Sequence, residues 1–217
     1  LPEDYIIKCS QEVDLNKFAG MDCYVGVDLA ATSDLTAVAY LVVLDGTYHF
    51  KTHYYLPESA LKDKADKELY KYWKQQGYLT VTSGNVTDYD YITTDMLRYA
   101  DVVNIQSVGY DKYNATQWAI DSTEQGLPLE EYPQTLGNFN MPTRELERLI
   151  LSGKAVIDNN EINRYCFRNV TLKSDYNGNV KPNKAVDKKK IDGTIAMIQA
   201  LGMYLRTPHY TNEILTI

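Results

Sequence analysis

Residues 24–40 read YVGVDLAATSDLTAVAY, and this stretch decides the fold because it contains an apolar strand that ends in a carboxylate. The first half has apolar residues around Gly26 and is predicted as a buried strand that breaks at the small polar run 30–33. Asp28 stands at the end of this strand, and Asp34 follows six residues later. Because an unpaired buried charge is costly, we expect an acid in this position to be hydrogen-bonded, ion-paired or bound to a cation.

The length of 217 residues fits one large domain that needs no disulfide or structural metal; two domains are possible but not required. Residues 1–22 have no clear period and are expected to form a lead-in or linker segment, ahead of a domain that spans residues 23–217. The three cysteines are scattered and form no CxxC pair, which favours reduced thiols in a cytosolic setting. No stretch approaches the roughly 20 apolar residues of a membrane span, so no membrane partner is expected.

The strand and helix signals predict a mixed α/β fold. Strands at 23–29, 36–44 and 48–55 follow one another, with Asp45-Gly46 as the turn of a tight hairpin, and are expected to be antiparallel. Strands and helices alternate afterwards, which predicts a mixed sheet with helices on both faces. The later strands are expected at 102–110 and 127–132, with a short extended piece at 155–157 and a second hairpin at Asn177-Gly178. Helices are expected at 62–76, 88–99, 115–125, from Pro142 to Gly153, at 160–170 and at 191–205.

Two further acids are predicted to meet Asp28. Asp111 follows the strand 102–110, and the carboxyl ends of neighbouring strands converge on one crevice in such sheets. Asp192 lies in the first turn of the last helix, next to its buried stripe. Each acid alone has a structural alternative, which for Asp192 is a capping or helix-dipole role. The three together favour a shared site.

Clustered carboxylates repel one another unless a cation neutralises them. Without His or Cys at metal-ligand spacing, oxygen ligands favour Mg²⁺ or Mn²⁺. Two such ions, roughly 3.5–4 Å apart, can activate a water and stabilise the leaving oxygen in phosphodiester hydrolysis. The chain has no GxSxG, HExxH or Cys-His arrangement that indicates another hydrolytic mechanism.

Five ordered blocks carry a resemblance to a known family: GVDLAATSDLTA, TVTSGNVTDYDYI, VGYDKYNATQWA, PTRELERLILSGK and KKKIDGTIAMIQAL. Over roughly residues 20–206, the chain resembles the C-terminal nuclease domain of the large terminase subunits of tailed bacteriophages. The resemblance implies an RNase H-like fold and a metal-dependent endonuclease that cuts concatemeric viral double-stranded DNA in packaging. It also implies that Asp28, Asp111 and Asp192 bind two Mg²⁺ or Mn²⁺ ions, with Asp34 as an auxiliary acid.

The same resemblance implies partners and a location. The partners are double-stranded DNA and, for the full-length protein, the small terminase subunit and the portal, in the cytoplasm of the infected bacterial host. Although the formal net charge is −7, lysines crowd the segment before the last helix and are candidates for contacts with DNA phosphates. These candidates are Lys184, Lys188, Lys189 and Lys190.

The family also has an ATPase motor upstream, but this chain contains no GxxxxGK[ST] loop, so ATP-driven translocation is not expected of it.

Two other functions stay open at this point. DLAAT resembles the phosphate loop of actin-like and sugar-kinase ATPases, although the second glycine-rich segment of those proteins is missing. A catalytically weak module that docks DNA or the portal is the remaining alternative.

Overall fold

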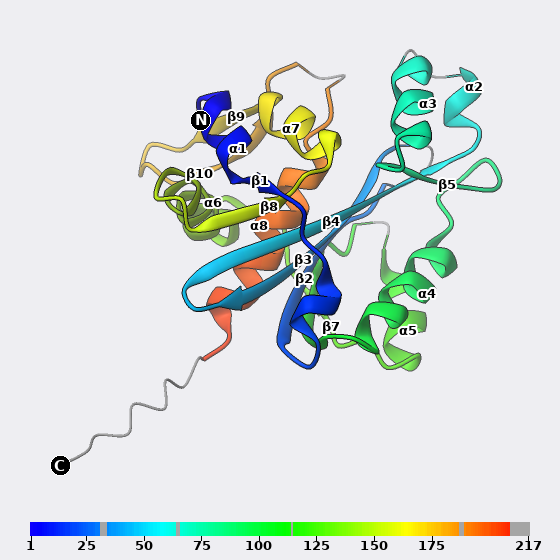
Figure 1. The fold of residues 1–217 in the computed structure, drawn as a ribbon, viewed down its shortest axis with the longest axis horizontal. Helices are drawn as coiled ribbons and strands as arrows, with labels where there is room; N and C mark the ends of the chain where they lie inside the picture. Colours follow the sequence, from blue (N-terminus) through cyan, green and yellow to red (C-terminus); the bar gives the residue numbers. More distant parts are fainter. Residues whose placement is uncertain (31–33, 64–65, 114, 187–188, 209–217) are drawn as a thin grey trace.

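The computed structural model describes residues 1–30, 34–63, 66–113, 115–186 and 189–208. Within these ranges the fold is built on a sheet of eight strands in the order β1-β8-β4-β3-β2-β6-β7, with β5 paired to β4 (Figure 1). The strands are β1 (Ser10–Gln11), β2 (Asp22–Asp28), β3 (Thr36–Leu44), β4 (Thr47–Pro57), β5 (Thr80–Thr82), β6 (Asn104–Tyr110), β7 (Leu129–Glu131) and β8 (Ala155–Asp158).

Strands β2, β3 and β4 form the antiparallel meander that the sequence predicts. Asp45 and Gly46 connect β3 to β4 with φ angles of 50° and 73°, the left-handed backbone that a two-residue hairpin of this type requires. Strand β6 then pairs parallel to β2, and β7 parallel to β6. The predicted mixed sheet is thus confirmed, and β2 lies at its centre with an antiparallel neighbour on one side and a parallel neighbour on the other.

Helices cover both faces of the sheet, as Figure 1 shows, with α4 and α5 on one side and α6, α7 and α8 on the other. Alternate strand residues supply the two cores: Ala39 and Leu41 pack toward α8, whereas Tyr40 and Val42 pack toward α4. The helices are α1 (Glu3–Cys9), the 3-10 turn η1 (Leu15–Phe18), α2 (Ala60–Asp63), α3 (Lys67–Gln75), α4 (Tyr89–Ala100), α5 (Thr116–Glu124), α6 (Leu136–Leu151), α7 (Glu161–Arg168) and α8 (Asp192–Arg206).

The start of α6 differs from the prediction. We expected the helix to open at Pro142, but it begins at Leu136, where the hydroxyl of Thr135 accepts a hydrogen bond from the Asn138 amide. Proline inside a helix leaves the carbonyl four residues earlier without its partner. Here that carbonyl belongs to Asn138, and the Tyr132 hydroxyl donates to it at 2.7 Å. A tertiary contact therefore replaces the missing helical bond.

The first 22 residues, expected as a lead-in, pack on the same sheet. Strand β1 pairs parallel to β8, and Ile6, Val13 and Leu15 are buried.

The predicted helix at 62–76 is represented by two shorter helices, α2 and α3. The second predicted hairpin is confirmed as β9 (Val170–Ser174) and β10 (Val180–Lys184), a separate two-stranded sheet. No helix within the described residues has the length and apolar character needed to cross a membrane.

Helix α8 lies directly on the backbone of β2. A Cβ atom added at Gly26 would overlap the Ala196 carbonyl oxygen and the Ala200 amide nitrogen, both backbone atoms of α8. On the neighbouring strand, an added Cβ at Gly109 would overlap the side chain of Met203. Glycine therefore sets how closely the helix approaches, and this contact fixes the first turn of α8 over the carboxyl end of β2.

We expect Gly26→Ala to destabilise the fold by about 3 kcal/mol or more, because backbone atoms of α8 cannot move aside as a side chain can. Gly137→Ala is the matched control, since Gly137 lies in α6 and a Cβ added there meets nothing within 4 Å. Urea unfolding of the two variants and the parent measures the difference. A Gly26→Ala protein as stable as the parent would contradict the close packing of α8.

Candidate functional site

Asp28 and Asp111 emerge side by side from neighbouring strands. The parallel ladder of β2 and β6 ends with Val27 opposite Tyr110, so the next residue of each strand is one of the two acids. Side chains alternate along a strand, so Asp28 shares the face of Gly26, against which α8 packs. The predicted convergence of strand ends thus brings these two carboxylates to the same edge of the sheet.

Gln134 contacts both carboxylates. Its side-chain Nε2 donates to Asp28 Oδ1 at 3.1 Å, and its backbone amide donates to Asp111 Oδ2 at 3.0 Å. The Tyr113 amide donates to the other oxygen of Asp111 at 3.0 Å. Gln134 has no signal in the sequence, because it lies in the connection between β7 and α6 and belongs to no recognised motif.

Asp192 comes from the opposite end of the chain. It is the first residue of α8, one helical turn before Ala196, which contacts β2 at Gly26. The N-cap position belongs to Ile191, so the Asp192 side chain does not occupy the capping position. Its Oδ2 is buried and has no hydrogen-bond partner among the described residues. A buried carboxylate oxygen without a donor is suited to accept a cation.

The electrostatics of the acids reflect their burial and proximity. Burial, followed by the charge of Asp192, raises the pKa of Asp28 well above its ordinary value. Burial and the nearby Asp34 carboxylate raise the pKa of Asp192 to about 6. The protein thus compensates the charged forms of these two acids only in part, and a bound cation would supply the rest.

Asp34 is already neutralised. Its Oδ1 accepts a backbone bond from Leu35 at 2.9 Å and forms an ion pair with Lys190 Nζ at 2.5 Å. Burial raises the pKa of Asp34, but the hydrogen bond and charge of Lys190 outweigh this effect and lower the pKa below its ordinary value. Lys190 is itself only 13% exposed, so its ammonium group is committed to Asp34.

The other predicted lysines differ in their surroundings. Lys184 is half-buried at the end of β10, and its charge lowers the pKa of Asp28 and of Asp192. Lys189 is exposed and places Nζ 5.6 Å from the centre of the Tyr165 ring. Lys188 lies outside the described residues. Of Lys184, Lys189 and Lys190, only Lys184 lines the acidic cleft without an ion-pair partner among the described residues.

A cleft of about 520 Å³ opens over this arrangement. Its polar and charged lining consists of Asp28, Asp34, Gln134, Lys181, Asn183, Lys184 and Asp192. Asp111 is connected to the cleft through Gln134. Among the described residues, no three His, Cys, Asp or Glu side chains stand close enough to form a ready-made metal site. The atoms that could bind a metal are carboxylate oxygens, and one of them, Asp192 Oδ2, has no hydrogen-bond partner among the described residues. These residues therefore suit a hard divalent ion that draws the carboxylates together.

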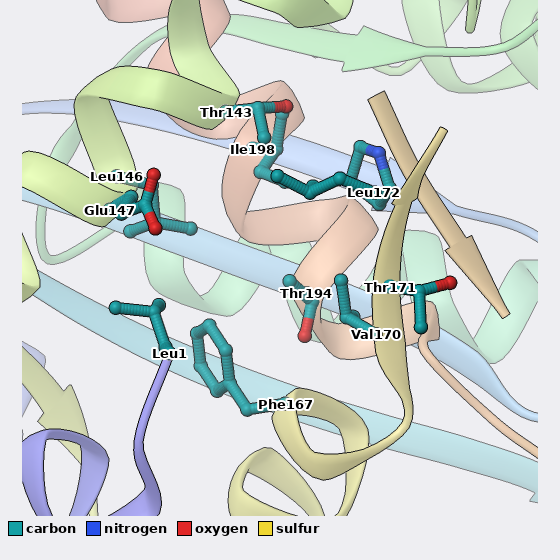
Figure 2. Close-up of a pocket in the computed structure, with 11 residues that line it drawn as sticks. Leu1, Thr143, Leu146, Glu147, Phe167, Val170, Thr171, Leu172, Thr194 and Ile198 are labelled. Atoms are coloured by element: carbon teal, nitrogen blue, oxygen red, sulfur yellow. The ribbon is translucent and has the colours of Figure 1, made fainter. Parts of the chain in front are cut away.

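A second cavity, of about 320 Å³, lies between α6, α8 and the β9–β10 hairpin (Figure 2). Leu146, Phe167 and Ile198 contribute to its largely apolar lining, and Glu147 is its one ionisable side chain among the described residues. Pro182 of β10 borders both cavities. This cavity thus contains no cluster of carboxylates like the one in the acidic cleft.

Comparison with known proteins identifies relatives. Residues 6–207 match the family model of the terminase large subunit, endonuclease domain. Protein YmfN of Escherichia coli (strain K12) is 31% identical over 210 residues, which cover 88% of this chain and 45% of YmfN. The terminase large subunit of Enterobacteria phage HK97 is 28% identical over 184 residues, covering 82% of this chain and 36% of the relative. The chain thus spans less than half the length of these relatives.

Solved structures agree with the fold. The crystal structure of the HK97 bacteriophage large terminase aligns with a TM-score of 0.83 at 26% identity, covering 93% of this chain and 43% of that chain. The large terminase nuclease from thermophilic phage G20c with bound magnesium aligns with a TM-score of 0.57 at 12% identity, covering 83% and 80% of the two chains. The fold is RNase H-like, as the sequence predicts.

We expect Asp192→Asn to stabilise the metal-free protein at about pH 8 by about 1 kcal/mol or more, which raises Tm by about 2–4 °C per kcal/mol. The folded state holds the Asp192 proton up to a pKa of about 6, whereas the ordinary pKa of an aspartate is 3.8. The parent therefore loses stability as the pH rises through this window, and the advantage of the variant develops between these two values.

Glu130→Gln removes one negative charge from an exposed position on β7 and serves as the control. Thermal unfolding in the presence of EDTA, from about pH 4.5 to about pH 8, measures both variants. Equal or lower stability of Asp192→Asn at the high-pH end would show that the Asp192 carboxylate is compensated within the protein.

Proposed function

The chain belongs to the endonuclease-domain family of terminase large subunits, and we propose that it is a metal-dependent endonuclease that cuts concatemeric viral double-stranded DNA during genome packaging. The observation that carries this proposal is the convergence of acids from separate elements on one end of the sheet: Asp28 of β2 and Asp111 after β6 share Gln134 as a hydrogen-bond donor, and Asp192 of α8 lines the same cleft as Asp28. Burial and the charges of Asp192 and Asp111 raise the pKa of Asp28, and Gln134 donates a hydrogen bond to both Asp28 and Asp111. A structural role does not require such an arrangement.

We assign Asp28, Asp111 and Asp192 as the ligands of two Mg²⁺ or Mn²⁺ ions, with Asp34 as an auxiliary acid. The magnesium in the G20c nuclease, and the cobalt in a second structure of that protein, support the use of a divalent ion. When bound, two such ions supply a water activated at neutral pH and stabilise the leaving oxygen of the phosphodiester. The protein contributes the carboxylates and a cleft in which their charges are poorly screened.

Two described lysines are assigned to the DNA backbone. Lys184 lines the cleft beside the acids, and Lys189 is exposed just ahead of α8, so we assign both to contacts with phosphates. Such contacts hold the duplex without reading its sequence. Lys188 belongs to the same proposal but lies outside the described residues. Lys190 and Asp34 neutralise each other, and their ion pair connects the residue after the first strand-end loop to the segment that leads into α8.

The proposal extends to partners and setting. In a longer chain that carries a motor domain, the small terminase subunit and the portal are the expected partners, and the host cytoplasm is the expected location. Residues 23–217 are taken as the nuclease domain, with residues 1–22 packed on its edge through β1.

Plasmid cleavage tests the proposal. With Mg²⁺ or Mn²⁺, we expect Asp28→Asn, Asp111→Asn and Asp192→Asn each to lower the rate by about 100-fold or more, since loss of a metal ligand removes several kcal/mol of transition-state stabilisation. Glu130→Gln, the exposed control on β7, is expected to cut like the parent. EDTA is expected to abolish cleavage.

Unchanged cutting by all three site variants would overturn the assignment of the acids. A parent protein that binds DNA but does not cut it with either metal would instead favour the docking-module alternative. Thermal stabilisation by ATP without any metal-dependent cutting would favour the actin-like alternative.

A further inference from the structure

We propose that Gln134 is a positioning residue that holds Asp28 and Asp111 in register for metal binding, and that Lys181 anchors it to the β9–β10 hairpin. The inference rests on the proposed function, because it concerns the same carboxylates. It assigns a role to a residue that touches neither metal nor DNA in the proposed mechanism and acts through the two acids.

Gln134 uses different groups for the two acids. The side-chain amide donates to Asp28, whereas the backbone amide donates to Asp111. A substitution at this position therefore removes the bond to Asp28 and leaves the bond to Asp111 available. Glutamine also donates without adding charge, whereas a glutamate there would add another carboxylate to the cluster.

The loop that carries Gln134 is held from three directions. The Tyr132 amide donates to the Tyr110 carbonyl at 2.6 Å, which attaches the loop to β6. Its other end is joined to α6 through Asn138, whose Nδ2 donates to the Pro133 carbonyl at 2.8 Å. The third contact comes from β10, where Lys181 Nζ donates to the Gln134 carbonyl at 3.1 Å. Gln134 therefore sits on a fixed support and can orient a carboxylate.

The Lys181 contact connects the hairpin to the acids. Lys181 lines the same cleft as Lys184 and comes from the same strand. Of these two lysines, Lys181 donates to the loop that carries Gln134, and Lys184 makes no such bond among the described residues, so the two are expected to act differently. Movement of β10 would move the carbonyl of Gln134 and, through it, both donors to the acids.

The first test measures Mn²⁺ binding to the metal-free protein by isothermal titration calorimetry, in the absence of DNA. We expect Gln134→Met to weaken Mn²⁺ binding by about ten-fold, the lower end of the loss that follows removal of a bond to a metal ligand. Gln106→Met is the matched control, because Gln106 Nε2 donates to Asp22 Oδ1 at 2.9 Å between the same two strands, at their amino ends. It is expected to bind Mn²⁺ like the parent.

Cleavage as a function of metal concentration separates positioning from general damage. For Gln134→Met, and for the shorter Gln134→Asn, the Mn²⁺ concentration at half-maximal rate is expected to rise about ten-fold while the saturated rate stays near that of the parent. A rate that falls equally at every metal concentration in both variants would overturn the positioning role. Circular dichroism verifies that each variant is folded.

Substitutions of Lys184 and Lys181 are expected to change the affinity for Mn²⁺ in opposite directions. Removing a positive charge beside the acids should strengthen cation binding, and this is the result expected of Lys184→Met. Lys181→Met is expected to weaken Mn²⁺ binding, because the loss of the anchor outweighs the loss of charge. Tighter binding by both variants would show that Lys181 acts only through its charge and would overturn the anchoring role.

The outcomes also distinguish this inference from the proposed function. If the parent binds no divalent ion and cuts no DNA, the proposed function fails. If the parent binds and cuts while Gln134→Met behaves like Gln106→Met, the positioning role of Gln134 is wrong and the proposed function stands.

Discussion

The contact between α8 and the bare backbone of β2 at Gly26 is the constraint on which the rest of the structure depends. The helix approaches the strand so closely that no side chain fits between them. This approach places Asp192, one helical turn before the contact, over the end of the strand where Asp28 emerges. Two carboxylates from opposite ends of the chain thereby come together at the edge of the sheet where β2 ends.

The close packing has an electrostatic cost. Burial and the charge of Asp192 raise the pKa of Asp28, while burial and the charge of Asp34 raise the pKa of Asp192. Lys184 only partly offsets these effects. Asp34 differs because Lys190 neutralises it directly. The protein therefore keeps two acids poorly compensated while it satisfies a third one nearby. Such a pattern is typical of sites that bind cations, in which stability of the metal-free form is reduced in favour of affinity.

Much of the fold follows from local sequence signals, and what does not follow depends on tertiary contacts. Asp45-Gly46 predicts its hairpin because few residues adopt the backbone of that turn, and Asp111 can be found because it directly follows an apolar strand. The start of α6 could not be predicted, since the hydroxyl of Tyr132 compensates for Pro142 from outside the helix. Gln134 has no local signal either. Its importance comes from two acids that the fold brings to it, and the pairing of Lys190 with Asp34 has the same origin.

The central claim is that Asp28, Asp111 and Asp192 form one site that closes around divalent ions. A crystal of this chain soaked in Mn²⁺, with anomalous differences measured at the manganese edge, tests it most directly. The account predicts two manganese peaks in the acidic cleft, bridged by the carboxylate of Asp28, with Asp111 and Asp192 as the outer ligands. Peaks elsewhere on the surface, or acids that remain too far apart to share an ion at saturating Mn²⁺, would contradict it.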